Sequence, residues 1–548
     1  MAMMSMRRLF SLLFLALTLV AIASEGASRS FRGSPFVQKR ALQECNAILA
    51  SWSKDQVYEI VQSALFNQFG ANSTEATVAS FTLLPAIAYG VQVRRLCASC
   101  SDFPVDEQPE AYASFRSGYG SNTSFSGLLM IPLAEDGSFL PGTHAGNIYC
   151  HGTSTQSVPT TEFQGESSDL QIMLNLVITS TGAVTLMPDY MGYGESSGTI
   201  YKAYLVKQQY QTSIIPLWLM ADRIIKTESD CTSALAAAAA VLGYSEGGYA
   251  AVALAEGLDK MGVDIIKVEA GAGPYRMASA VILTTTENTD LGTFPSEGRH
   301  YFALVSAAYS STYPEIPNFD QGQDMLASQS RSMIVELVTN SSSTAEVQST
   351  IPVDDPLSIF SSALLSFVRD AIVDGDTDPC NSADRIVEGV NDKLCDALKE
   401  NDLNSVLETS EYPVRLCHSP DDEVVSFENL PDFDKNVLLE FLESSGTHFE
   451  AAVPCLLQAM LFMLSSDFQD YPVEAKDTDE GCPAPTLSPT PSPLALSSSP
   501  SSVPESTKPP PAFASEASSE PTMSNAHRII AARVVFGSAF IGTIAALV

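Results

Sequence analysis

The chain has 548 residues, of which 45% are hydrophobic and 17% are charged. This balance is typical of a packed globular protein and excludes a chain that is disordered throughout. The 64 acidic residues outnumber the 29 basic residues, so the formal net charge is −35. Such a surface repels phosphate backbones, and we therefore do not expect a nucleic acid as a partner.

Residues 1–23 have the pattern of a secretory signal peptide. Arg7 and Arg8 precede an apolar run over residues 9–22, and the small residues Ala21 and Ala23 form a cleavage pattern. The run is shorter than the roughly 20 apolar residues of a membrane span. Entry into the secretory route fits three N-glycosylation acceptors, which are Asn72, Asn122 and Asn340.

The secretory route makes disulfides possible for the ten cysteines. Cys380 and Cys395 lie close together in one segment, and we predict a disulfide between them. Cys97 and Cys100 have the spacing of a redox or metal pair. No second such pair and no clustered histidine follows, which favours a structural role. Two further cysteines end candidate strands and are predicted to be small buried residues: Cys150 and Cys417.

The distribution of apolar residues predicts an α/β fold. Residues 24–90 form an N-terminal segment with one helical stretch, Gln43–Phe66. From residue 91 to residue 480, short apolar runs alternate with helical stretches, which predicts a mostly parallel sheet with helices on both faces. Residues 276–406 lack this rhythm and are predicted to be a helical insertion above the sheet. The predicted strands are Ser126–Ile131, Gly146–Cys150, Val184–Met187, Ala236–Leu242, Ile265–Ala270 and Val414–Cys417.

The C-terminal part differs in composition. Residues 483–525 are rich in Pro, Ser and Thr and are predicted to be a stalk, because such a segment buries too little apolar surface to fold. Residues 526–548 end in an uncharged apolar run, Val534–Val548. A small-residue site at Ser524, a short spacer and this run describe a GPI-attachment signal. We therefore expect membrane contact through a C-terminal anchor, with a tail-anchored helix starting near Ile529 as the alternative.

Two segments match the pattern Gly-x-Ser-x-Gly, in which flanking glycines let a strained turn close around a nucleophilic serine. Ser245 follows the apolar run Ala236–Leu242 and opens a helix rich in small residues. Ser196 lies well past the nearest predicted strand, in a glycine-rich turn. The strand–turn–helix context favours Ser245 as the nucleophile and a loop-shaping role for the segment around Ser196.

A serine nucleophile needs a histidine base and an acid, which follow it in this order in α/β-hydrolases. His300, His418 and His448 lie between Ser245 and the stalk. His448 stands just before a helical run, at the place where the base belongs. The acid is expected in the loop after the strand Val414–Cys417, where three carboxylates compete: Asp421, Asp422 and Glu423.

The negative oxygen that develops during acyl transfer needs backbone N–H donors. One should come from the residue after the nucleophile, Glu246, and another from the loop that begins at His151 after the run Gly146–Cys150. Gly152 and Thr153 are the candidates in that loop, since a glycine permits close approach of the backbone.

The motifs together resemble the secreted-lipase family of yeasts and its bacterial relatives, over roughly Val91–Met463. The matching motifs, in order, are Cys150-His-Gly-Thr, Met187-Pro-Asp-Tyr-Met-Gly-Tyr-Gly, Gly243-Tyr-Ser-Glu-Gly-Gly, His418-x-x-x-Asp422-x-Val-Val and Gly446-Thr-His448. The resemblance implies the α/β-hydrolase fold, Asp422 as the acid between Ser245 and His448, and a helical lid over an acyl pocket. Two residues depart from the family. Glu246 replaces a glutamine or another neutral residue, and Ser419 replaces a glycine.

No cofactor and no metal is expected. The sequence contains no P-loop, no HExxH and no complete dinucleotide-binding fingerprint. Asp374, Asp376 and Asp378 resemble the start of a calcium loop. However, Pro379 and Arg385 occupy the positions that need glycine and glutamate, so a plain acidic loop is predicted.

The leading hypothesis is a secreted serine hydrolase that cleaves carboxylic esters through an acyl-enzyme on Ser245, with a lipid or another acyl ester as substrate. A peptidase of the prolyl-oligopeptidase type shares the order of the triad. That type usually carries a large β-propeller before the hydrolase domain, and only residues 24–90 are available here. A catalytically inactive surface protein with the same fold is the third hypothesis, and the three triad residues in order argue against it.

Overall fold

The computed structural model describes residues 45–69, 80, 83–99, 102, 123–154, 158, 160, 163, 169–197, 202–278, 299–313, 325–339, 344–350, 356–376, 378–382 and 392–473. Several predicted features lie outside these ranges, namely the signal peptide, the three glycosylation acceptors Asn72, Asn122 and Asn340, the stalk, and the C-terminal segment with Ser524. Within the described ranges, no helix combines the length and the apolar character that a membrane span requires.

The described strands form one nine-stranded mixed sheet in the order β1-β2-β3-β5-β4-β6-β7-β8-β9. Neighbouring strands from β5 to β9 are parallel, whereas β1, β2, β3 and β5 pair in an antiparallel way. The sheet is therefore mostly parallel, as the sequence predicts. The strands are β1 (Ile48–Trp52), β2 (Gly90–Ser99), β3 (Ser124–Leu133), β4 (Gly142–Cys150), β5 (Val184–Pro188), β6 (Ser233–Tyr244), β7 (Asp264–Gly271), β8 (Val414–His418) and β9 (Leu439–Glu443).

All six predicted strands are present as β3 to β8, and three further strands were not predicted. One of them, β1, corrects the predicted helix Gln43–Phe66, because Ile48–Trp52 pairs with β2 at the edge of the sheet. The helix begins only at Lys54. Ser53 and Gln56 form a reciprocal capping box, with their side chains bonded to each other's backbone N–H groups at 3.4 and 2.9 Å. This local signal marks the start of the helix.

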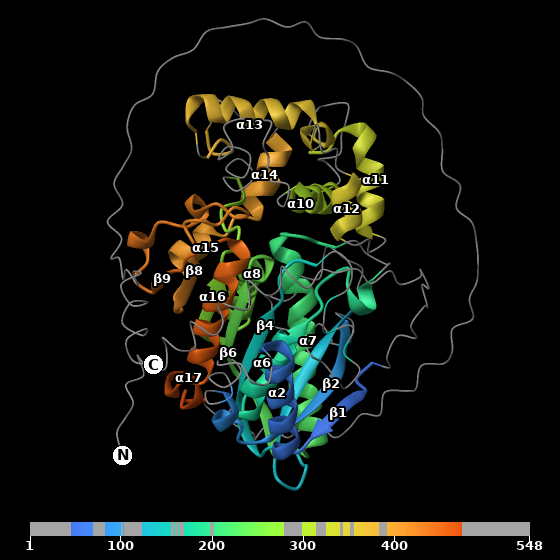
Figure 1. Ribbon diagram of the computed structural model, residues 1–548, viewed down its shortest axis with the longest axis vertical. Helices are drawn as coiled ribbons and strands as arrows, with labels where there is room; N and C mark the ends of the chain where they lie inside the picture. Colours follow the sequence, from blue (N-terminus) through green and yellow to red (C-terminus); the bar gives the residue numbers. More distant parts are fainter. Residues whose placement is uncertain are drawn as a thin grey trace, which may run out of the picture. The chain divides into compact units, whose positions relative to one another are not determined.

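Two helical layers cover the sheet, as predicted (Figure 1). Side chains alternate along each strand, so β3 places Leu129 and Ile131 in one core and Leu128 and Met130 in the other. Helices α7 and α8 pack in the first core, and α2, α6 and α16 pack in the second, with α2 and α6 in front of the sheet in Figure 1. The bounds are α2 (Lys54–Phe69), α6 (Leu170–Ser180), α7 (Lys207–Glu228), α8 (Glu246–Lys260), α16 (His448–Met463) and α17 (Ser466–Gln469).

The predicted insertion between β7 and β8 is helical in its described residues, and its role as a lid stays a prediction. It packs on the α7–α8 side, where Tyr309 donates a hydrogen bond to the Leu205 carbonyl at 3.3 Å and Gln209 donates one to Thr312 at 2.9 Å. The helices are α10 (Arg299–Thr312), α11 (Ser328–Thr339), α12 (Thr344–Thr350), α13 (Ser362–Asp374), α14 (Asp392–Glu400) and α15 (Asn404–Thr409).

The predicted disulfide between Cys380 and Cys395 is present. Cys150 is a free buried residue, as expected, but Cys417 corrects its prediction, because it is bonded to Cys455 of α16. The two cysteines are 38 positions apart, so no local sequence pattern predicts that they pair. Disulfides persist in oxidising compartments, so the described bonds indicate a protein of the secretory route or the cell exterior.

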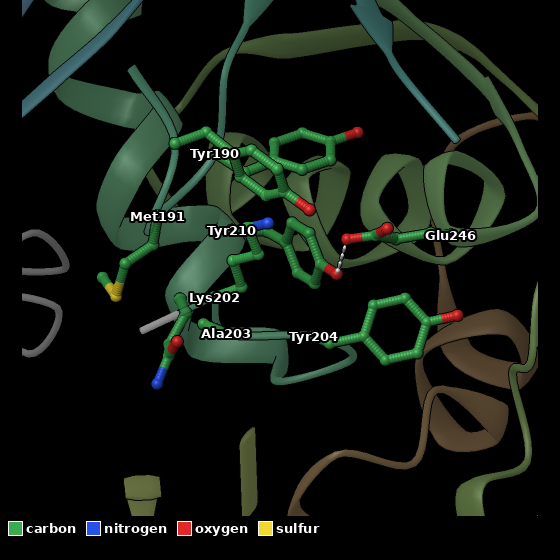
Figure 2. A pocket seen from close by; sticks show the side chains of 9 residues that line it. Tyr190, Met191, Lys202, Ala203, Tyr204, Tyr210 and Glu246 are labelled. Atoms are coloured by element: carbon green, nitrogen blue, oxygen red, sulfur yellow. Dashed lines mark hydrogen bonds between the residues drawn. The ribbon is translucent and has the colours of Figure 1, made fainter. Parts of the chain in front are cut away.

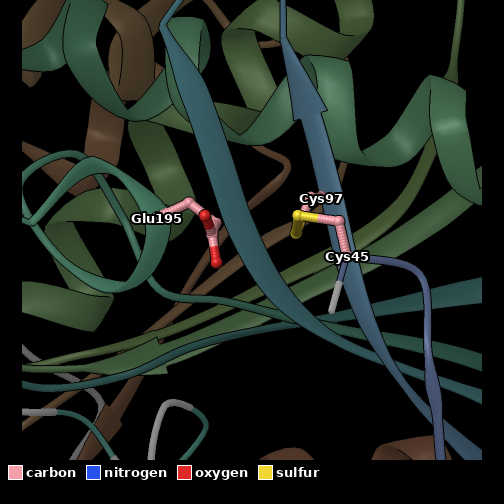
Figure 3. A group of neighbouring side chains, drawn as sticks. All are labelled: Cys45, Cys97 and Glu195. Carbon is pink, nitrogen blue, oxygen red and sulfur yellow. A yellow bond between two sulfur atoms is a disulfide. The ribbon is translucent and has the colours of Figure 1, made fainter. Parts of the chain in front are cut away.

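Cys97 has a structural role, as predicted, through a disulfide to Cys45. The carboxylate of Glu195 lies beside this disulfide and completes a group with the spacing of a metal site (Figure 3). Both sulfur atoms are bonded to each other and cannot act as thiolate ligands, which metal binding by cysteine requires. The group is therefore a disulfide with a neighbouring carboxylate.

Candidate active site

Ser245 occupies a strained turn between β6 and α8. Its φ of 59° and ψ of −123° are unusual for a residue with a side chain. The turn can form because its neighbours are glycines. A Cβ atom on Gly243 would lie 2.3 Å from the Gly247 carbonyl oxygen, and one on Gly247 would lie 2.2 Å from the Cys150 carbonyl oxygen. The close approach of β4, β6 and α8 thus requires the glycines that the motif supplies.

The structure brings the three predicted triad residues together in one hydrogen-bonded chain. The Nε2 atom of His448 lies 2.9 Å from the Ser245 hydroxyl oxygen, and its Nδ1 atom lies 2.7 Å from the Asp422 carboxylate. The imidazole and the carboxylate are buried. This arrangement can hold the imidazole with its proton on Nδ1, so that Nε2 is free to accept the serine proton.

Asp422 is held in its ionised form. Burial raises its pKa, but hydrogen bonds from His418 and His448 outweigh burial and hold the pKa well below its usual range. The second carboxylate oxygen accepts the backbone N–H groups of Val424 and Val425 at 2.9 and 2.8 Å. A carboxylate with this many donors stays charged at neutral pH.

His418 lies beside the triad, a position that the sequence motif contained without assigning it a role. Its Nε2 atom is 2.9 Å from the Val425 carbonyl oxygen and 3.3 Å from the Asp422 carboxylate. Its Nδ1 atom is buried without a hydrogen-bond partner among the described residues. The proton therefore belongs on Nε2, because a buried N–H without an acceptor is costly.

The loops that carry the acid and the base are bonded to each other. The hydroxyl of Ser419, the residue that departs from the family's glycine, donates to the Gly446 carbonyl at 2.6 Å. Glu423 accepts the backbone N–H of His448 at 3.0 Å, and Tyr244 donates to the His448 carbonyl at 2.6 Å. Of the three competing acids, Glu423 thus positions the base through its backbone, and Asp422 contacts the imidazole.

Ser196 occupies the short helix η4 (Gly194–Ser196), away from this chain of bonds. Its buried hydroxyl donates to the Tyr193 carbonyl at 2.9 Å and accepts the Gly192 backbone N–H at 2.8 Å. A hydroxyl used in this way closes a turn, which matches the loop-shaping role that the sequence indicates.

The predicted oxyanion-hole residues converge beside Ser245. Glu246 is the first residue of α8, and N–H groups in a first turn have no acceptor within their own helix. Gly152 and Thr153 follow β4, the strand that pairs with β6, and their backbone N–H groups donate no bond within the described residues. A Cβ atom on Gly152 would meet nothing nearer than the Tyr244 carbonyl oxygen at 3.5 Å. The protein itself therefore does not require glycine at this position.

Tyrosines fix the loop of residues 151–154, a support that the sequence did not predict. Three hydroxyl groups contact the loop: Tyr190 at the His151 carbonyl, Tyr193 at the Ser154 carbonyl, and Tyr204 at the Thr153 hydroxyl. The ring of His151 also stacks on Tyr190, with the ring centroids 3.9 Å apart. The backbone donors of the loop are thus held in place before any substrate binds, as electrostatic stabilisation requires.

The carboxyl group of Glu246 points into a small cavity that is lined by the same tyrosines (Figure 2). It accepts a hydrogen bond from the Tyr210 hydroxyl at 2.8 Å. Lys202 lines the same cavity, with its ammonium group 4.7 Å from the centre of the Tyr193 ring. Within the described residues the carboxyl group has no hydrogen bond to Ser245 or His448, and it lies beside the tyrosines that hold the loop of residues 151–154.

A buried ion pair anchors the turn that carries Tyr190 and Tyr193. Arg95 of β2 lies 2.5 Å from Asp189, and both side chains are almost fully buried. Ser126 donates to Asp189 at 2.6 Å, and Thr160 donates to its other oxygen. Asp189 belongs to one of the quoted motifs, but only the fold brings Arg95 to it. Removal of one partner would leave a buried charge unpaired, at a cost of about 3–5 kcal/mol.

These parts can carry out nucleophilic acyl transfer. The serine hydroxyl, the imidazole and the carboxylate form the proton-transfer chain, and the backbone N–H groups of Glu246 and of the Gly152–Thr153 loop are the candidates to bind a developing oxyanion. The described residues contain no group with metal-ligand spacing apart from the one at the Cys45–Cys97 disulfide.

No family model matches the sequence, and no curated protein matches it either. Solved structures match the fold. A protein of Legionella pneumophila assigned as a hydrolase aligns with a TM-score of 0.53 at 17% identity, over 76% of this chain and 96% of its own. The rice cell wall degrading esterase LipA from Xanthomonas oryzae aligns with a TM-score of 0.52 at 18% identity, over 77% of this chain and 96% of its own.

The chain therefore has the α/β-hydrolase fold, a fold it shares with these proteins. At such identities the likeness shows the fold alone, and the activity has to be argued from the site. Lipase A from Candida antarctica in its closed state also aligns, at 12% identity and a TM-score of 0.43, over 70% of this chain and 79% of its own. That score is too low to support an argument.

Proposed function

We propose that this protein is a secreted serine hydrolase that cleaves carboxylic esters through an acyl-enzyme on Ser245. The observation that carries the proposal is the chain of bonds from Ser245 through His448 to Asp422, which starts at a residue with positive φ. A structural serine has no need of a strained backbone or of a free imidazole nitrogen at 2.9 Å.

The reaction would proceed in two halves. In the first, Nε2 of His448 takes the proton of Ser245 while the serine oxygen attacks the ester carbonyl, and the oxyanion accepts N–H bonds from Glu246 and the Gly152–Thr153 loop. The imidazolium, stabilised by Asp422, then protonates the leaving alcohol. In the second half, water attacks the carbonyl of the acyl-enzyme while His448 takes its proton. The imidazolium then returns the proton to the serine oxygen, which releases the carboxylic acid and regenerates Ser245.

A fluorophosphonate probe, which reacts with activated serines, tests the proposal directly. The wild-type protein should be labelled at Ser245, and Ser245→Ala should abolish the label. Ser196→Ala is the matched control, since its serine also lies in a Gly-x-Ser-x-Gly segment but its hydroxyl bonds to the backbone of its own turn. An unlabelled wild-type protein, or a label on Ser196, would overturn the assignment.

Kinetics of the same variants measure the size of the effect. Ser245→Ala and His448→Ala should each lower kcat for a soluble ester by roughly 10⁵–10⁶, because members of a triad act as a unit. Ser196→Ala should leave kcat near the wild-type value. A matched pair of ester and amide substrates with the same acyl group separates an esterase from a peptidase, because both enzymes cleave the ester but only a peptidase turns over the amide efficiently; efficient cleavage of the amide would favour the peptidase hypothesis.

A further inference from the structure

Glu246 is a buried carboxyl group at the site where negative charge would develop. Its side chain is 3% exposed, and the same residue offers its backbone N–H to the proposed oxyanion hole. One carboxyl oxygen accepts the Tyr210 hydroxyl, and the other, Oε2, is buried without a hydrogen bond among the described residues. An ionised carboxylate in this position therefore relies on the Tyr210 hydrogen bond at 2.8 Å, with the Thr153 hydroxyl and Lys202 as its further stabilising neighbours.

The groups that face this carboxyl group are mostly neutral hydroxyls. Lys202 is the one cation among those that interact with it in the described part of the chain. The neutral groups are the Cys150 thiol, the Thr153 hydroxyl, and the phenols of Tyr190, Tyr193, Tyr204 and Tyr210. Burial raises the pKa of Glu246 to about 7, against the opposing effects of Tyr210, Thr153 and Lys202. Both protonation states are thus populated near neutral pH.

The carboxyl group belongs to the same hydrogen-bonded cluster as the oxyanion loop. The Tyr210 hydroxyl donates to Glu246 and accepts the Leu205 backbone N–H at 3.1 Å. Tyr204, which directly precedes Leu205, contacts the Thr153 hydroxyl through its own hydroxyl. A proton on Glu246 therefore changes charge and hydrogen bonding directly behind the two sets of backbone donors.

We propose that Glu246 is a positioning residue whose proton controls the oxyanion hole: the neutral carboxyl group supports transition-state binding, and the ionised one opposes it. The reason is electrostatic, because a fixed negative charge near a developing oxyanion is poorly screened among buried groups. The inference rests on the proposed ester hydrolysis and adds to it a dependence on mildly acidic pH.

The test compares kcat/KM of the wild type with that of Glu246→Gln, using a soluble short-chain ester from pH 5.5 to pH 8. Proton transfer by His448 is common to both proteins and cancels in the ratio of wild type to variant. We expect a ratio near one at pH 5.5 that falls by about tenfold toward pH 8, with a midpoint near pH 7. The change should lie in kcat, since the oxyanion exists only in the transition state. A ratio that is constant with pH would overturn the proposal.

Glu269→Gln is the matched control. Burial also raises the pKa of Glu269 to about 7, but this residue lies on β7 and pairs with Arg415 at 2.7 Å. The ratio of kcat/KM between the wild type and Glu269→Gln should therefore not change with pH, since Glu269 contacts none of the side chains around Glu246 in the described residues. A step of equal size in this variant would mean that the pH dependence reports the ionisation of any buried carboxyl, which contradicts the proposal.

Tyr210→Phe provides an independent variant. The Tyr210 hydroxyl lowers the pKa of Glu246. The fall of kcat/KM with pH in Tyr210→Phe should therefore have its midpoint at a higher pH than in the wild type. A midpoint that stays in place or moves to lower pH would contradict the coupling. Fluorophosphonate labelling of the wild type separates the two levels of the argument: an unlabelled, inactive protein refutes the proposed function, and an active protein with a flat ratio refutes only the role of Glu246.

Discussion

The disulfide between Cys417 and Cys455 should matter both for stability and for the geometry of the triad. Cys417 directly precedes His418 at the end of β8, and Cys455 lies two turns into α16, the helix that begins at His448. The bond thus links the strand that leads to the acid with the helix that carries the base. Both cysteines are nearly buried, beside Tyr244.

The loop lengths of two disulfides set the expected magnitudes. Cys417 and Cys455 are 38 residues apart, and Cys380 and Cys395 in the insertion are 15 residues apart. In the chain-entropy treatment, these loops correspond to about 4 and about 3 kcal/mol of unfolding free energy. Replacing either pair by alanines removes similar buried atoms, so the cavity contributions are alike. We therefore expect the pair Cys417 and Cys455 to contribute about 1 kcal/mol more.

Urea unfolding followed by tryptophan fluorescence measures these differences, since Trp52 reports on the sheet through β1 and Trp218 reports on the helical layer through α7. Activity is then measured under conditions where each double variant is folded. Loss of the bond at Cys417 should lower kcat by about tenfold or more, because small displacements of reacting groups are costly. Loss of the bond at Cys380 should change kcat by less than about twofold. Full activity of the folded Cys417 variant, or a greater loss of stability in the Cys380 variant, would contradict this prediction.

Three further outcomes are expected. Asp422→Asn should lower kcat by about 10⁴, through loss of the imidazole tautomer and of its charge stabilisation, and Asp421→Asn should retain activity in the same steady-state assay. Since the folded pKa of Asp422 lies below its unfolded value of about 4, its contribution to stability is present above pH 4 and is lost as pH falls through the folded pKa. Thermal unfolding should therefore show a wild-type advantage over Asp422→Asn at pH 6 that shrinks toward pH 2, and a constant advantage would contradict it. Phosphatidylinositol-specific phospholipase C should release the enzyme from intact cells, whereas a mature peptide ending at Val548 would contradict GPI anchoring.

Strands whose signal is local could be predicted from the amino-acid sequence. The six predicted strands are mostly apolar runs whose residues are mainly buried, so local composition distinguishes them. Ser245 could be separated from Ser196 for the same reason, because a strand, a glycine-flanked turn and a helix follow one another without interruption. The order of serine, acid and histidine along the chain then limited the partners to a few residues, and the predicted three lie within hydrogen-bonding distance.

Features that depend on contacts between distant parts of the chain could not be predicted and are visible only in the fold. The sequence pattern predicts β1 as part of a helix, and only its pairing with β2 makes it a strand. The disulfide partner of Cys417 is 38 residues away. Asp422 and Glu423 are adjacent and chemically alike, and the fold alone gives one the imidazole and the other the backbone N–H of His448. The environment of Glu246 has the same origin. Its pKa is set by burial among side chains from β4, the turn after β5 and α7, and no pattern within the elbow motif contains that information.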